Sequence, residues 1–141
     1  AISFKNDIAL LTVSAYETLM GYQFLTKVFT VLQNNRISVD AVNTTEASVT
    51  IALSNSDKLN ELSRLFIEIG SVEFQRNKGI ISVIGFQATN SNTICSKIFE
   101  GSENFDVDMI SFTHQKRILS LVVNEKDIID TTKRIHKNIF E

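Results

Sequence analysis

The sequence repeats its apolar pattern at a spacing of 70 residues, and this repeat limits the folds open to the chain more than any other feature. A shift of 70 places Lys27-Val28-Phe29 on Lys97-Ile98-Phe99 without a gap. The same shift superposes two alternating apolar strands: Val49, Ile51 and Leu53 fall on Leu119, Leu121 and Val123. Mostly core and cap positions match, so the chain is predicted to contain two copies of one fold.

The two copies share the order of their first five predicted elements. Apolar residues at helical spacing predict helices around residues 24–32, 59–69, 94–99 and 128–139. We expect Ser54 or Ser56 to cap the second helix, Gly70 to end it, and Asn124 to cap the fourth. Strand-like runs occupy residues 9–13, 37–42, 48–53, 72–76, 80–86, 105–112 and 118–123.

The resulting order is βαββαβ followed by βαββα, so the second copy lacks a final strand. The missing strand is predicted at the N-terminus, because a shift of 70 aligns residues 71–74 with residues 1–4. The alternative is that residues 1–7 form a frayed terminus. We predict an α+β protein with two tandem ferredoxin-like modules, each an antiparallel sheet with helices on one face. The first module spans residues 8–77, and the second spans 78–141 and is completed by a strand from 1–7.

Composition excludes several classes of function. The 141 residues are 43% hydrophobic and 21% charged, with a formal net charge of −2, whereas nucleic-acid-binding domains are usually basic. The predicted strands also lack the exposed aromatic pair of an RNA-binding sheet. No apolar run is long enough to span a membrane, and no signal peptide opens the chain. The single cysteine, Cys95, is expected on the core side of a helix in a reducing compartment, and we predict a cytoplasmic protein.

The two copies differ at polar positions. Under the ungapped shift of 70, Asp40 falls on Ile110 and Glu46 falls on Lys116. The loop 14–23 shares almost nothing with its counterpart 84–93. The comparison therefore predicts acidic groups at the second strand of the first copy and none at that of the second.

These differences suggest a binding site for an amino acid in the first copy. A helix beginning near Gln23 presents unpaired N–H groups and a positive dipole end, which favour a carboxylate. Gly21 permits close approach of a ligand to the backbone. Asp40 could bind an ammonium group, and a second acidic oxygen from Glu46 would favour a basic amino acid. The alternative is that Asp40 caps a turn and Glu46 is solvated.

Evidence for catalysis or metal binding is weak. The sequence has no phosphate-binding loop and no GxGxxG motif. His114 and His136 have no Cys, His or carboxylate partner at a metal-ligand spacing. We therefore expect no catalytic residue and no metal site, and both histidines are predicted to be structural or exposed.

Three segments resemble the C-terminal regulatory region of aspartate kinases, most closely the monofunctional lysine-sensitive type. They are FLTKVF, NNRISVDAVNTTEASVTIAL and RIHKNIFE, of which ISVD followed by TTEASV is the most specific. The resemblance covers essentially the whole chain. It implies two tandem ACT domains, the first inserted in the second, in a parent enzyme that phosphorylates aspartate with ATP.

The resemblance also implies an effector and its site. L-lysine would bind as feedback inhibitor between the first modules of a homodimer, with the kinase domain elsewhere in the same parent chain. ATP and Mg would belong to that kinase domain, so no cofactor is expected in this region. Carried over by position, the effector-binding residues are Thr18, Met20, Gly21, Tyr22, Gln23, Phe24, Leu25, Ser38, Val39, Asp40, Thr44, Thr45 and Glu46.

Two departures from the family pattern affect these expectations. Gln23 replaces a glycine that commonly precedes Phe-Leu, which would reshape the carboxylate pocket if that glycine supplied a positive φ or a close approach. The hairpin 113–117 of the second copy also lacks the usual small and polar pattern, so we expect that module to bind no effector. A structural dimerisation module without an effector, or a sensor of another amino acid such as threonine, remains the alternative.

Overall fold

The computed structural model describes residues 1–16, 21–54, 56–85, 91–101, 105–113, 115 and 117–140. The chain divides into two compact units. One, here called the inserted unit, comprises Asp7–Arg76, and the other, here called the composite unit, comprises Ala1–Asn6 and Asn77–Glu141. Each unit starts one residue earlier than the corresponding predicted module.

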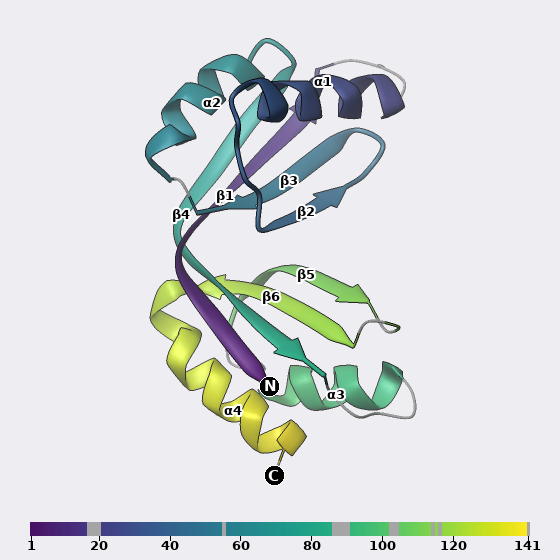
Figure 1. The fold of residues 1–141 in the computed structure, drawn as a ribbon, viewed down its shortest axis with the longest axis vertical. Helices are drawn as coiled ribbons and strands as arrows, with labels where there is room; N and C mark the ends of the chain where they lie inside the picture. Colours follow the sequence, from purple (N-terminus) through teal and green to yellow (C-terminus); the bar gives the residue numbers. More distant parts are fainter. Residues whose placement is uncertain are drawn as a thin grey trace. The chain divides into compact units, whose positions relative to one another are not determined.

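The described residues of the inserted unit form two α-helices, two complete strands and parts of two longer strands, which Figure 1 labels. Its elements are the later part of β1 (Ile2–Ala15), α1 (Gly21–Asn34), β2 (Ala41–Thr44), β3 (Ser48–Leu53), the short 3-10 helix η1 (Ser56–Lys58), α2 (Leu59–Phe66) and the first part of β4 (Gly70–Ile84). The strand order is β2-β3-β1-β4. Antiparallel pairing joins β1 to β3 and β3 to β2, which is the strand arrangement of a ferredoxin-like unit.

The composite unit repeats this plan with segments from both ends of the chain. It contains the first part of β1, the later part of β4, α3 (Ser91–Gly101), β5 (Val107–Thr113), β6 (Ile118–Asn124), the short 3-10 helix η2 (Glu125–Asp127) and α4 (Ile128–Phe140). Its strand order is β1-β4-β6-β5. The backbone of Ala1 bonds to Ile84, with the Ile84 N–H 2.8 Å from the Ala1 carbonyl oxygen. The N-terminal residues therefore lie in a strand. Both units have the ferredoxin-like strand order, so the predicted α+β fold class is confirmed.

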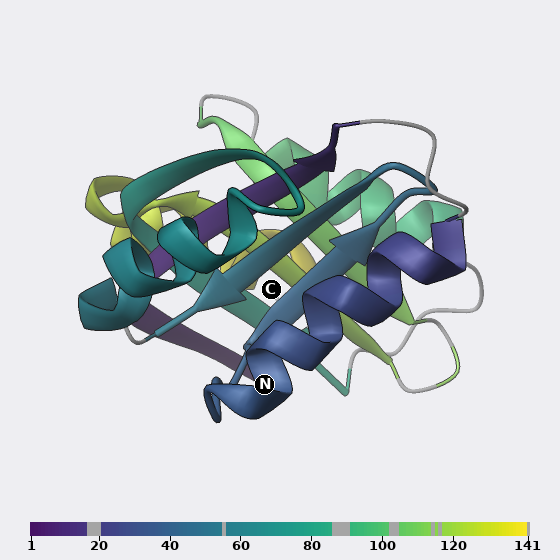
Figure 2. The ribbon, with the colours of Figure 1, turned by 90° about the horizontal axis from the view of Figure 1, so that it is seen from above.

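Each unit has its own hydrophobic core between its helices and one face of its sheet. In the inserted unit the alternate residues of β1 and β3 pack against Phe24, Val28 and Leu32 of α1 and against α2. In the composite unit the same positions of β4 and β6 pack against Ile98 of α3 and against α4. Figure 2 shows α1 and α2 together on one side of the strands of the inserted unit. The alternation of buried residues in the strands determines which face receives the helices.

The repeat of 70 holds for the central strands but not for β2 and β5. Ala9 pairs with Leu53 and Gly79 pairs with Val123, so these strands differ by 70 positions. In the outer hairpins, however, Ala41 pairs with Ala52 while Met109 pairs with Val122. Equivalent residues of β2 and β5 are therefore 68 positions apart. A longer β5–β6 turn compensates for a shorter connection between α3 and β5.

This offset overturns the predicted correspondence of Asp40 with Ile110. The residue equivalent to Asp40 is Asp108, which lies at the bulge between Val107 and Met109. Ile110 is equivalent to Val42, because both pair with equivalent residues of the neighbouring strand. The prediction that the second copy lacks a carboxylate here was wrong. Lys116, the predicted counterpart of Glu46, lies outside the described residues.

Other predictions about strands and helix ends also need correction. The predicted strands 72–76 and 80–86 belong to one strand, β4, within the described residues. Gly70 begins β4, and a Cβ at this position would lie 2.2 Å from the Ser14 carbonyl oxygen, so the backbone approach and not a helix end requires glycine. Lys58 is the N-cap of α2. Asn124 does precede the helical turn η2, but its side chain makes no capping hydrogen bond.

Candidate functional site

The predicted helix start coincides with the first turn of α1. Gly21 is its first residue, and the N–H groups of the first turn have no partner within the helix. The side chains of Tyr22 and Gln23 are exposed, Tyr22 by 67%. Gln23 lies in regular helix, so no left-handed backbone is needed where the family commonly has glycine. Its side chain instead takes up space that a glycine would leave open.

The next two residues of this turn face the core. Phe24 is fully buried, and Leu25 is partly buried against the same cluster. Of the predicted site residues, Phe24 can therefore offer a ligand only its backbone. Thr18 and Met20 lie outside the described residues.

A shallow hollow lies beside the start of α1. Its volume is about 590 Å³, and its lining includes Tyr22, Gln23, Thr26 and Lys27. The hydroxyl group of Thr26 donates a 2.7 Å hydrogen bond to the Tyr22 carbonyl oxygen, which fixes this side chain on the helix. An aromatic ring, an amide and an ammonium group thus border an open space large enough for an amino acid.

Asp40 lies at the other predicted part of the site, just before β2. Its N–H donates to the Ala52 carbonyl oxygen at 2.7 Å, which anchors the backbone against β3. Its carboxylate accepts a 2.6 Å hydrogen bond from the Ser54 hydroxyl group. Ser38, Val39 and Asp40 are all exposed. The predicted capping role of Ser54 is thus replaced by a bond that orients the Asp40 carboxylate towards the end of β3.

Thr44, Thr45 and Glu46 lie at the β2–β3 turn, and all three are exposed. The Thr45 hydroxyl oxygen accepts from the Ser48 N–H at 3.0 Å and lies 2.9 Å from the Ser48 hydroxyl oxygen. Thr45 therefore stabilises the turn, as threonine commonly does in such loops. Glu46 sits at the tip with its carboxylate in solvent.

The predicted site residues form two groups at opposite ends of the inserted unit. The start of α1 and the β2–β3 turn share one end, which Figures 1 and 2 show, and Ala15 at the end of β1 bonds to Ala47 in that turn. Asp40 is at the opposite end, near the last turn of α1, where the Ile37 N–H donates to the Leu32 carbonyl oxygen. An extended strand advances about 3.3 Å per residue, so Asp40 and Glu46 are roughly 20 Å apart. A single chain therefore does not bring the side chains of Thr44–Glu46 close to Asp40.

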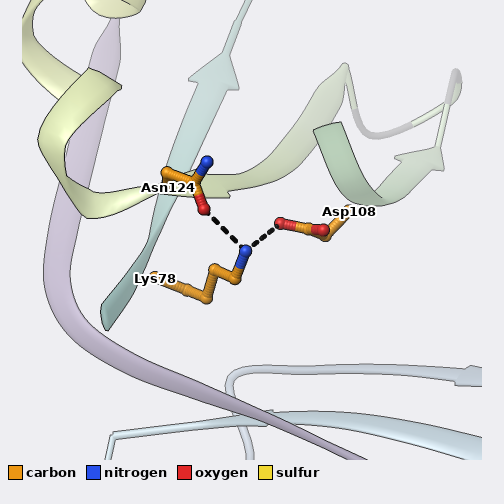
Figure 3. A network of polar contacts seen from close by, with 3 residues as sticks. All are labelled: Lys78, Asp108 and Asn124. Atoms are coloured by element: carbon orange, nitrogen blue, oxygen red, sulfur yellow. Dashed lines mark hydrogen bonds and ion pairs between the residues drawn. The ribbon is translucent and has the colours of Figure 1, made fainter. Parts of the chain in front are cut away.

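A buried cluster in the composite unit was not predicted from the sequence (Figure 3). The Lys78 ammonium group lies 2.8 Å from the Asp108 carboxylate and 2.7 Å from the Asn124 carbonyl oxygen. A shift of 70 places Lys78 on Ile8. That exchange of an apolar residue for a lysine was the sequence signal that could have revealed the cluster.

The described residues contain no group of three His, Cys, Asp or Glu side chains able to hold a metal ion. His136 is exposed, whereas His114 lies outside the described part of the chain. Cys95 is partly buried against the core of the composite unit, as predicted. No described helix is both long and apolar enough to cross a lipid bilayer.

The chain is similar in sequence to known aspartokinases. It is 31% identical over 147 residues to aspartokinase of Candida albicans, and 32% identical over 154 residues to the chloroplastic aspartokinase 2 of Arabidopsis thaliana. Both matches cover 100% of this chain but only 27% and 28% of the relatives. The chain thus spans little more than a quarter of their length. No family model matches the sequence.

Solved structures share the fold over the whole chain. A protein assigned as the C-terminal regulatory domain of aspartate kinase from Porphyromonas gingivalis superposes with a TM-score of 0.88 at 23% identity, covering 100% of this chain and 97% of that one. Aspartokinase III of Escherichia coli in complex with lysine and aspartate superposes with a TM-score of 0.81 at 26% identity. That match covers 100% of this chain and 33% of the E. coli protein. Both the sequence and the fold match the regulatory part of these enzymes.

Proposed function

We propose that this chain, which corresponds to the regulatory region of aspartate kinases, binds L-lysine and thereby controls a parent aspartate kinase. The observation that carries the proposal is the similarity, over the entire chain, to an aspartokinase solved with lysine bound. The parent enzyme would transfer the γ-phosphate of ATP to the β-carboxylate of aspartate. ATP and Mg would bind in its kinase domain, outside this chain, and the regulatory region itself would need no cofactor.

The two ends of the inserted unit supply complementary chemistry for a basic amino acid. The N–H groups at the start of α1 and its positive dipole end favour a carboxylate. Asp40 and Glu46 each offer a carboxylate for an ammonium group. Lysine carries one carboxylate and two ammonium groups, which is the combination that these groups would bind. Threonine or methionine carries a single ammonium group and would therefore match only one of the two acidic groups.

The separation of these groups supports a site shared between two copies of the chain. β2 is the outermost strand in the order β2-β3-β1-β4, and outer strands offer unpaired backbone groups to a second chain. An antiparallel, twofold arrangement along β2 would place Asp40 of one copy near the α1 start and Glu46 of the other. Each homodimer would then contain two equivalent lysine sites.

Control of the parent kinase follows from differential affinity. If lysine binds one arrangement of two copies more tightly than another, it shifts the population towards that arrangement. The kinase domain, joined to this region in the same chain, would experience that shift. We propose a cytoplasmic location for the protein, with plastids as the alternative suggested by the Arabidopsis relative; cell fractionation would distinguish them.

Calorimetry tests the identity of the effector. Lysine, threonine and methionine are titrated separately into the 141-residue chain, and we expect saturable heat from lysine alone. Heat from threonine but not from lysine would identify threonine as the effector in place of lysine. Absence of heat from every amino acid at millimolar concentration, together with a dimer in sedimentation, would favour a structural dimerisation module.

Mixing two defective variants tests whether the site is shared. Asp40→Asn removes the carboxylate, and Gln23→Glu places a negative charge where the effector carboxylate is expected. Each variant alone should bind lysine at least about tenfold more weakly. In a statistical mixture of twofold dimers, about a quarter of all sites combine two unaltered halves, so binding should return to that level. No recovery after complete subunit exchange would contradict a shared site.

A further inference from the structure

Lys78 is a buried cation held by two side chains of the composite unit. It lies near the middle of β4, and only 7% of its surface is exposed. Its ammonium group contacts Asp108 at 2.8 Å and Asn124 at 2.7 Å, and Figure 3 shows both partners converging on it from β5 and the end of β6. Burying an ammonium group is costly unless it is paired and hydrogen-bonded, and these two contacts provide that compensation.

The inserted unit contains the same corner without a lysine. Asp40 is equivalent to Asp108 through the register of the outer hairpins, and Ser54 is equivalent to Asn124 through the register of the central strands. There the Ser54 hydroxyl group bonds directly to the Asp40 carboxylate at 2.6 Å. The residue equivalent to Lys78 is Ile8, which is buried and apolar. In both units, therefore, a polar side chain at the end of the third strand or just after it shares a corner with an aspartate before or within the second.

We propose that Asp108 and Asn124 form a binding site for a primary ammonium group, and that the side chain of Lys78 fills this site as a built-in ligand. A carboxylate and an amide oxygen accept two of the three hydrogens that an ammonium group donates. The four-carbon stem of Lys78 delivers the ammonium group from the neighbouring strand. The site is thus occupied in every molecule and closed to ammonium ligands from solution.

A built-in ligand would prevent the composite unit from binding a free amino acid at this corner. A tethered ligand competes at a high effective concentration against any free one. If the inserted unit binds an amino acid as proposed, the composite unit would then bind none at Asp108. This consequence rests on the proposed function, whereas the ammonium site of the composite unit does not.

The site is tested by removing the built-in ligand and supplying it from solution. Lys78→Ala deletes three methylene groups and the ammonium group, which together correspond to n-propylammonium. Removing one member of a buried ion pair leaves the other uncompensated, and we expect the melting temperature to fall by roughly 10 °C. Addition of n-propylammonium up to about 0.1 M, a range suited to a weakly binding fragment, should restore several degrees in a saturable manner.

Matched controls separate binding from general salt effects. Sodium chloride at equal ionic strength and tetramethylammonium, which has no N–H donor, should not restore the melting temperature. The double variant Lys78→Ala/Asp108→Asn should not respond to n-propylammonium, and Lys78→Met should also not respond because its side chain fills the space. If Lys78→Ala does not fold, n-propylammonium should restore a cooperative unfolding transition.

Three results would overturn the proposal. They are a Lys78→Ala variant as stable as the unaltered chain, an equal response to tetramethylammonium, and an equal response of the double variant. A failure of lysine to bind the inserted unit would overturn the proposed function but would not change the outcome of this experiment. The ammonium site and the proposed function can therefore be refuted independently of each other.

Discussion

Replacing Asp40 with asparagine changes its charge while keeping its shape. The asparagine carbonyl oxygen can still accept the hydrogen bond from the Ser54 hydroxyl group, which is 2.6 Å long in the structure. The backbone bond from residue 40 to Ala52 is also unaffected. We therefore expect Asp40→Asn to fold with both of these hydrogen bonds in place and to lose the attraction of a carboxylate for the effector's ammonium group.

The expected decrease in lysine affinity depends on how far Asp40 is exposed to solvent. A hydrogen bond to a charged group contributes about 1.5–3 kcal/mol. Asp40 is exposed, so solvent screening places the contribution near the lower end of that range. Each 1.4 kcal/mol is a factor of ten in the dissociation constant, so lysine should bind roughly 10- to 30-fold more weakly.

Calorimetry on both aspartate variants provides the assay. Asp108→Asn is the matched control, because Asp108 occupies the equivalent position and contacts Lys78. It should lower the melting temperature and leave the lysine dissociation constant within about twofold, since distant sites act independently. An unchanged dissociation constant in Asp40→Asn would remove Asp40 from the effector site. An equal loss in both variants would mean that stability, and not contact with the ligand, determines binding.

Three further substitutions test the packing and the helix start. Phe24→Ala empties a fully buried position and should lower the free energy of unfolding by about 3–5 kcal/mol; urea denaturation would show this, and a loss below about 1 kcal/mol would contradict the burial. Gly70→Ala would place a Cβ 2.2 Å from the Ser14 carbonyl oxygen, so the melting temperature should fall by several degrees, and an unchanged value would contradict that approach. Gln23→Gly opens the α1 start and should strengthen lysine binding in calorimetry; weaker binding in a variant that remains folded would show that the Gln23 side chain contacts the effector.

Much of the fold was predictable because it depends on local periodicity. The helical spacing of Phe24, Val28 and Leu32 and the alternation in β3 each determine which side chains meet in the core. Their recurrence after 70 positions then predicted the second copy and the strand at the N-terminus. These signals need no knowledge of which residues lie close in space.

The register of the outer hairpins could not be predicted in this way. A longer turn after β5 and a shorter connection before it cancel in the total length, so an ungapped shift hides both. That error paired Asp40 with Ile110 instead of Asp108. Because side chains alternate between faces, register determines which polar groups meet, and it can be read only from strand pairing.

The sequence by itself determined the two βαββαβ units, their cores and the candidate residues around Gln23 and Asp40. The tertiary structure decided how those residues are distributed: the α1 start and Glu46 lie at one end of the inserted unit, and Asp40 lies at the other. It also showed that Lys78 fills the corner of the composite unit that corresponds to Asp40. The physical reason is that periodicity along the chain specifies burial, whereas distances between polar groups depend on the pairing of strands that are far apart in sequence.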